Sequence, residues 1–188
     1  MHDLTVLLLP GWQDSGPQHW QSAWERRHRC LRVRQHDWMH PLRGDWVARL
    51  EEVVIDLPGP GERDVLIAAH SLGCLLTAAW AAHSRHTARI RGALLVAPGD
   101  PQREELAGPL HSWLPILQQA LPFPALLLGS QDDPYCSFER ARTFAQAWGA
   151  RFVDYGRRGH INAESGLGDW DEGWQLLQSL KDEPPSKD

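Results

Sequence analysis

The 188-residue sequence predicts an α/β fold, in which a mainly parallel sheet of about six strands carries helices on both faces. Short apolar runs alternate with longer segments of helical periodicity, as expected when a crossover helix follows each strand. A chain of this length can build one sizeable core but not two. We therefore expect a single domain over residues 1–180, followed by a polar tail, 181–188, that is disordered.

Six apolar runs are the expected strands, at residues 4–9, 31–35, 64–68, 91–97, 125–129 and 150–155. Six segments are expected to be helical, at residues 17–28, 45–55, 72–82, 110–121, 136–148 and 169–180. The first of these has a proline in its first turn and spaces Trp20, Ala23 and Trp24 along one face. The second starts at an acidic cap, Asp45, and the third is an unbroken run of helix formers.

Charge and composition argue against several classes of function. The net charge of −5 makes nucleic acid an unexpected partner. The apolar run at 4–9 is too short for a signal core or a membrane span, so we expect a cytoplasmic protein without a membrane partner. Cys30, Cys74 and Cys136 lack paired spacing, which argues against a disulfide framework and a zinc site, and no metal or cofactor is predicted. The sequence makes no prediction of the oligomeric state.

The segment Ala-His-Ser-Leu-Gly at residues 69–73 directly follows the apolar run at 64–68. A serine with a small residue two positions away on each side is typical of a nucleophile elbow, where a strand turns sharply into a helix. Larger side chains at the two flanking positions would collide with neighbouring backbone. Ser71 is therefore the candidate nucleophile, although a serine that merely caps the next helix would fit this segment alone equally well.

Two later segments favour a catalytic role for this serine. Asp132 and Asp133 follow the run at 125–129, and His160 follows the run at 150–155. Each group thus lies beyond the C-terminal end of an expected strand, in the chain order Ser, Asp, His that an α/β-hydrolase uses. Because Pro134 biases the residue before it toward extended backbone, we expect Asp133 to reach His160 and Asp132 to bond nearby backbone N–H groups.

Four motifs, taken in order, resemble those of one family. They are Leu-Pro-Gly-Trp-Gln-Asp-Ser-Gly-Pro-Gln-His-Trp at 9–20, Ala-His-Ser-Leu-Gly at 69–73, Gly-Ser-Gln-Asp-Asp-Pro-Tyr at 129–135, and Gly-His-Ile-Asn-Ala-Glu-Ser-Gly-Leu-Gly-Asp-Trp at 159–170. The sequence resembles the bacterial branch of small serine hydrolases related to retinoblastoma-binding protein 9. The resemblance implies a lidless α/β-hydrolase fold with a triad of Ser71, Asp133 and His160. The Leu-x-Cys-x-Glu motif of the mammalian member lacks its glutamate here, so retinoblastoma-protein binding is not expected.

These residues predict a mechanism and a substrate class. His160 would take the proton of Ser71, and backbone N–H groups of Leu72 and Trp12 would bind the developing oxyanion. Candidate substrate contacts are Trp12, Gln13 and His70. The interval 98–124 is too brief for a lid domain, which predicts a shallow, partly open site.

The sequence therefore predicts a carboxylic-ester hydrolase acting on small-molecule esters with small acyl groups. Two alternatives stay open: an amidase or aminopeptidase, and a non-catalytic interaction protein on the same fold.

Overall fold

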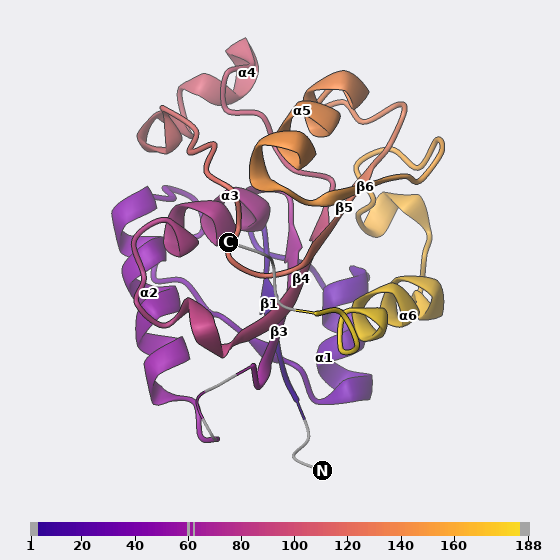
Figure 1. The fold of residues 1–188 in the computed structure, drawn as a ribbon. Helices are drawn as coiled ribbons and strands as arrows, with labels where there is room; N and C mark the ends of the chain where they lie inside the picture. Colours follow the sequence, from indigo (N-terminus) through magenta and orange to yellow (C-terminus); the bar gives the residue numbers. More distant parts are fainter. Residues whose placement is uncertain (1–3, 60, 62, 185–188) are drawn as a thin grey trace.

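One six-stranded parallel sheet organises the protein, as the computed structural model shows for residues 4–59, 61 and 63–184 (Figure 1). The strand order is β2-β1-β3-β4-β5-β6. The strands are β1 (Thr5–Leu9), β2 (Leu31–Arg32), β3 (Val65–His70), β4 (Ile90–Val96), β5 (Ala125–Gly129) and β6 (Arg151–Asp154). The predicted α/β fold with a parallel sheet is confirmed, although β2 is shorter than expected, with two residues paired to β1.

Helices cover both faces of the sheet, as predicted (Figure 1). One hydrophobic core joins the sheet to α2 (Arg43–Asp56), α3 (Leu72–Ala81) and α5 (Phe138–Trp148). The other joins the opposite face to α1 (Trp20–His28) and α6 (Asp171–Ser179). Strands β3 and β4 lie between the two cores, which explains why their sequences are almost continuously apolar.

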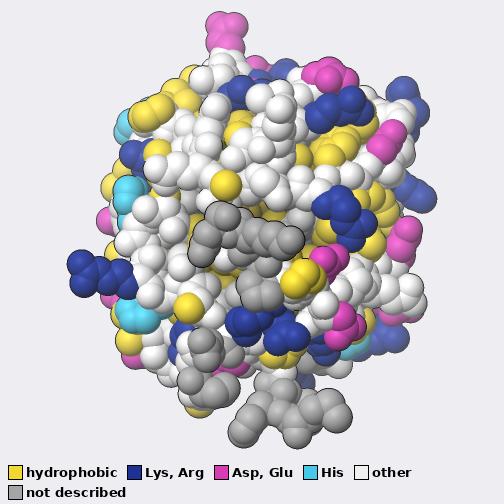
Figure 2. Space-filling model, in the orientation of Figure 1, with side chains coloured by type: hydrophobic (Ala, Val, Ile, Leu, Met, Phe, Trp, Pro, Cys, Tyr) yellow, Lys and Arg dark blue, Asp and Glu magenta, His cyan; other side chains and the backbone are white. Residues whose placement is uncertain are grey.

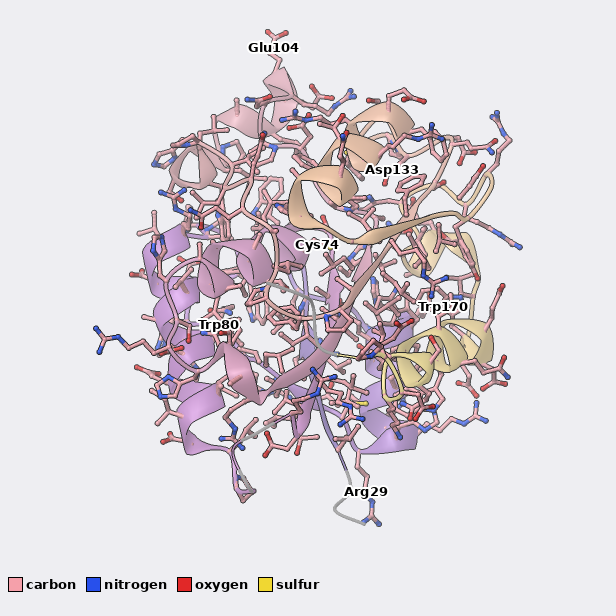
Figure 3. The ribbon with its side chains drawn as sticks, in the orientation of Figure 1. Arg29, Cys74, Trp80, Glu104, Asp133 and Trp170 are labelled. Carbon is pink, nitrogen blue, oxygen red and sulfur yellow. The ribbon has the colours of Figure 1, made fainter. Side chains whose placement is uncertain are left out.

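Tryptophan side chains attach loops to these cores. Trp20, Trp24 and Trp170 pack together, with ring centroids 4.7 to 5.6 Å apart, and Trp170 lies beside α6 (Figure 3). Their indole N–H groups reach loop atoms: Trp20 donates to the Ile161 carbonyl at 2.9 Å and Trp24 to the Asp169 carbonyl at 2.9 Å. Each tryptophan therefore buries a large ring while its polar end fixes a connecting segment.

The segment between β4 and β5 differs from the prediction. The helix expected at 110–121 is absent from the described residues, which contain a 3-10 turn at His111–Trp113 and, earlier, the short helix α4 (Glu104–Ala107). Proline disfavours helical backbone at the residue before it, and Leu114, which precedes Pro115, is extended, with φ −96° and ψ 143°. The chain then runs to β5 without further helix.

The start of α1 also differs. It begins at Trp20 rather than at residue 17, because the preceding His19 has extended backbone and acts as the N-cap. The His19 Nδ1 accepts the Gln21 N–H at 3.1 Å, so Pro17 lies in the loop ahead of the helix.

The surface mixes charges of both signs. On the face in Figure 2, Lys and Arg side chains are interspersed with Asp and Glu side chains rather than gathered in one patch. None of the helices in the described part of the chain has the length and apolar character needed to span a bilayer. At the C-terminal end, the carbonyls of Lys181 and Glu183 accept hydrogen bonds from Arg91 and Arg63. Residues 185–188 of the predicted tail lie outside the described residues.

Candidate active site

Ser71 lies at a sharp turn between β3 and α3. Its backbone has φ 54° and ψ −118°, a conformation that is strained for a residue with a side chain. Gly73 makes the turn possible, because a Cβ at that position would overlap the Leu9 carbonyl oxygen at the end of β1. A Cβ on Gly11 would likewise come within 2.8 Å of the Ser71 Cβ. The serine is thus held against the loop that follows β1.

The two adjacent aspartates have different partners. Both Asp133 carboxylate oxygens lie 2.9 Å from His160 Nδ1, and the two side chains are only 3% and 8% exposed. Asp132 faces away from this ring and accepts the Gly159 N–H at 2.8 Å and the Ser130 hydroxyl at 3.0 Å. The Gly159 N–H holds the pKa of the Asp132 carboxyl below its usual value. Asp133 therefore orients the imidazole, while Asp132 fixes the loop that carries it.

Ser71 and His160 line one cavity of about 400 Å³ at the C-terminal edge of the sheet. Among the described residues, the serine hydroxyl and the imidazole form no hydrogen bond with each other, and such bonds often tighten only when substrate is bound. The three predicted substrate contacts, Trp12, Gln13 and His70, also line this cavity. Five of the predicted site residues therefore line one cavity, and Asp133 contacts it through His160.

The backbone donors expected to bind an oxyanion lie beside the serine. Leu72 is the first residue of α3, so its N–H has no acceptor within the helix. Trp12 follows Gly11, whose backbone approaches Ser71 closely, and the Trp12 N–H donates to none of the other described residues. The Trp12 indole bonds the Met39 carbonyl at 3.0 Å, which fixes the ring on the rim of the cavity.

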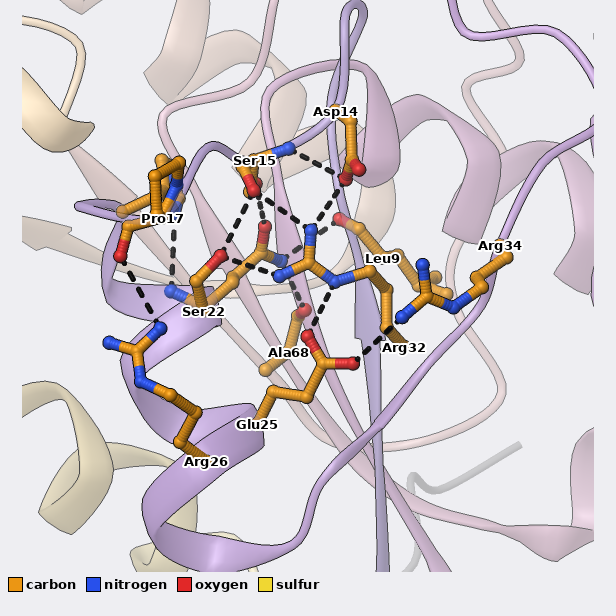
Figure 4. Close-up of polar contacts among 12 residues, drawn as sticks. Leu9, Asp14, Ser15, Pro17, Ser22, Glu25, Arg26, Arg32, Arg34 and Ala68 are labelled. Carbon is orange, nitrogen blue, oxygen red and sulfur yellow. Dashed lines mark hydrogen bonds and ion pairs between the residues drawn. The ribbon is translucent and has the colours of Figure 1, made fainter.

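A buried polar network supports the loop that carries Trp12 (Figure 4). The Arg32 guanidinium, whose side chain is 6% exposed, pairs with Asp14 at 2.7 Å and with Glu25 at 2.9 Å. It also donates to the Ser15 carbonyl at 2.9 Å. Gln21 ties the same loop to the sheet: it accepts the Ser15 hydroxyl, and its side-chain amide donates to the carbonyl at the end of β1 and to the Ala68 carbonyl within β3. A buried charge with this many partners holds the loop in one conformation.

Two further imidazoles lie behind His160. The His70 Nε2 donates to the His160 backbone carbonyl at 2.9 Å, and the two rings meet edge to face at 4.8 Å. Behind it, the His19 ring lies 4.6 Å from the His70 ring. Burial lowers the pKa of His19 to about 3 and the pKa of His70 well below its usual value, so both rings are neutral at pH 7. A neutral His70 keeps the N–H that holds the His160 backbone.

Several cavity residues escaped the sequence analysis. Tyr135 and Glu164 line the cavity and lie within the quoted motifs, but their side chains carry no local signal of function. The sequence also gives no sign of backbone strain near the site. Ala97 and Ile161 have positive φ there, at 46° and 45°. Strain of this kind concentrates at functional sites.

Cys74, the cysteine nearest to Ser71 in the sequence, is not a competing nucleophile. Burial raises the pKa of the Cys74 thiol, one helical turn away, so this thiol is not an activated nucleophile. The part of the chain that the structure describes contains no group of three or more His, Cys, Asp or Glu side chains placed to hold a metal ion.

Comparisons with known proteins identify relatives. A family model described as serine hydrolase matches residues 6–179. A YdeN-like hydrolase from Pectobacterium atrosepticum is 36% identical, with a TM-score of 0.81, over 95% of this chain and 91% of that one. The YdeN gene product of B. subtilis is 18% identical, with a TM-score of 0.71, over 96% of this chain and 100% of that one. Esterase 2 of Thermogutta terrifontis, phosphonylated by sarin, is 16% identical, with a TM-score of 0.67, over 95% of this chain and 83% of that one. The comparison with curated proteins found no match.

The contact at Gly73 predicts a stability effect. Gly73→Ala should lower the free energy of unfolding by about 1–3 kcal/mol, because the added methyl group must displace the end of β1. Gly44→Ala is the matched control, since a Cβ on this α2 residue meets open space, and it should be neutral or stabilising. Urea unfolding measures both variants. Equal effects would show that the elbow is not tightly packed.

Proposed function

Since the chain belongs to the serine hydrolase family, we propose that it is a carboxylic-ester hydrolase of small acyl substrates that uses Ser71, Asp133 and His160. One observation carries the proposal: a buried imidazole, paired with a carboxylate at 2.9 Å, shares a cavity with a strained serine. We also propose that, within this family, the chain is one of the small hydrolases related to retinoblastoma-binding protein 9.

The proposed reaction has two halves. His160 accepts the Ser71 hydroxyl proton as the serine oxygen attacks the ester carbonyl, and the Trp12 and Leu72 N–H groups bind the oxyanion. The imidazolium, stabilised by Asp133, then gives its proton to the departing alcohol, which leaves an acyl-serine. In the second half, a water molecule loses a proton to His160 and attacks the acyl group; His160 then returns the proton to the Ser71 oxygen as the acid leaves.

The decisive experiment is covalent labelling. A fluorophosphonate probe should label the wild-type protein at Ser71, because the phosphorus centre is open to the same serine attack as an ester carbonyl. Esterase 2 of Thermogutta terrifontis is itself phosphonylated by sarin. Ser71→Ala should abolish the label and lower ester turnover about a thousandfold or more. Ser179→Ala, on the exposed side of α6, is the control and should label normally. An unlabelled wild-type protein would instead support a non-catalytic interaction protein.

The two aspartates give a matched pair of variants. Asp133→Asn should lower kcat by up to about ten-thousandfold, because an amide no longer stabilises the imidazolium or its correct tautomer. Asp132→Asn keeps a side-chain oxygen for the Gly159 N–H and should cost far less. Steady-state turnover of a short ester measures both. A severe loss in Asp132→Asn with a mild one in Asp133→Asn would reassign the acid.

Acyl-chain length tests the substrate class. The cavity measures about 400 Å³, and of the described residues between β4 and β5, Leu106 of the short helix α4 lines it. We expect acetyl to butyryl esters to be hydrolysed with higher kcat/KM than esters of about eight carbons, because longer chains gain little further burial. A steady rise toward long chains would contradict this class. Parallel assays with anilides of the same acyl groups separate an esterase from an amidase.

A further inference from the structure

A second hollow adjoins the cavity that contains Ser71. It measures about 330 Å³ and shares Tyr135, His160, Asn162 and Glu164 with the first cavity. Most of its other lining comes from the loop just ahead of His160, including Arg157 and Arg158. The imidazole therefore lies on the boundary between two hollows, with the serine in only one of them.

Tyr135 lines both hollows and packs against His160. Its ring meets the His160 ring edge to face at 4.7 Å and is 41% exposed. Its backbone is fixed at both ends, because the Tyr135 N–H donates to Asp133 at 2.8 Å and its carbonyl accepts the Asp100 N–H at 3.2 Å. The Tyr135 ring is therefore held against the imidazole, where both residues line the two hollows.

The second hollow has an excess of positive charge. Arg158 is exposed, lies over the Tyr155 ring at 5.8 Å, and has no carboxylate within ion-pairing distance among the described residues. Its backbone is held in place, since its N–H donates to Ser130 at 3.0 Å and its carbonyl accepts the Ser165 hydroxyl at 2.6 Å. Arg157 adds a second cation, partly balanced by Asp132 at 3.6 Å. Glu164 is the one acidic residue in the wall.

We propose that the second hollow binds the leaving group of the ester and favours an alcohol that carries a carboxylate. This proposal rests on the hydrolase function argued above. Ser71 and the proposed donor Trp12 line the first cavity and not the second, so we assign the acyl group to the first cavity. His160 lines both and must protonate the departing oxygen. The leaving group then extends past the imidazole toward Arg158, whose planar guanidinium suits a carboxylate.

The test compares two esters with the same acyl group. In 4-acetoxybenzoate the leaving phenol carries a carboxylate, and in 4-acetoxybenzamide it carries a neutral amide of nearly the same size. The measured quantity is the ratio of their kcat/KM values. We expect a ratio above one in the wild-type protein that falls as salt is added, because exposed charges are screened.

Charge-changing variants should move this ratio in opposite directions. Arg158→Gln should lower it about threefold to tenfold, while Glu164→Gln should raise it about twofold. Arg29→Gln is the control, because Arg29 lies at the far end of the molecule from Asp133 (Figure 3), and it should leave the ratio unchanged.

Two results would overturn the proposal for different reasons. A ratio near one that neither Arg158→Gln nor Glu164→Gln changes, in a protein that hydrolyses both esters, would exclude the leaving-group site and keep the hydrolase. A wild-type protein that hydrolyses neither ester and takes no fluorophosphonate label would remove the hydrolase function, and the leaving-group site with it.

Discussion

The close approach of α3 to the end of β1 is the constraint on which the rest of the site depends. Gly73 lies directly against the Leu9 carbonyl, so the chain can leave β3, turn at Ser71 and enter the helix within a few residues. The same approach presses Gly11 against the serine and brings the Trp12 N–H to its side. Ser71 and the N–H groups that we propose as oxyanion donors are therefore positioned by one backbone contact, which explains why strain at Ser71 is tolerated.

The loop that carries His160 is held from three directions. Asp132 accepts the Gly159 N–H, His70 donates to the His160 carbonyl, and the Trp20 indole donates to the Ile161 carbonyl. These partners come from the loop after β5, from β3 and from α1. Because each bond joins a different element, a change in any one of them would leave two others in place. A β-branched residue such as Ile161 disfavours positive φ, so these hydrogen bonds hold its backbone in that conformation.

The sequence predicted best what depends on neighbours in the chain. Small residues around Ser71 indicated the turn, and Pro134 correctly indicated which aspartate would face the imidazole. Proline also biases Leu114, before Pro115, toward extended backbone, which argues against a helix at 110–121. The prediction of that helix did not take this bias into account. Tyr135 and Arg158 line the second hollow because of packing across the fold, so composition and periodicity carry no sign of their position.

The open site has a consequence for how it can select substrates. Between β4 and β5, Leu106 of the short helix α4 is the described residue that lines the cavity, so in the proposed reaction a bound ester would bury limited apolar area and gain little affinity from it. Selectivity must then come from polar groups held in fixed positions. Those groups lie on loops after the strands, and buried contacts, such as the Arg32 network and the His70 hydrogen bond, fix these loops to the sheet. The buried polar interactions thus substitute for the enclosure that a lid would supply.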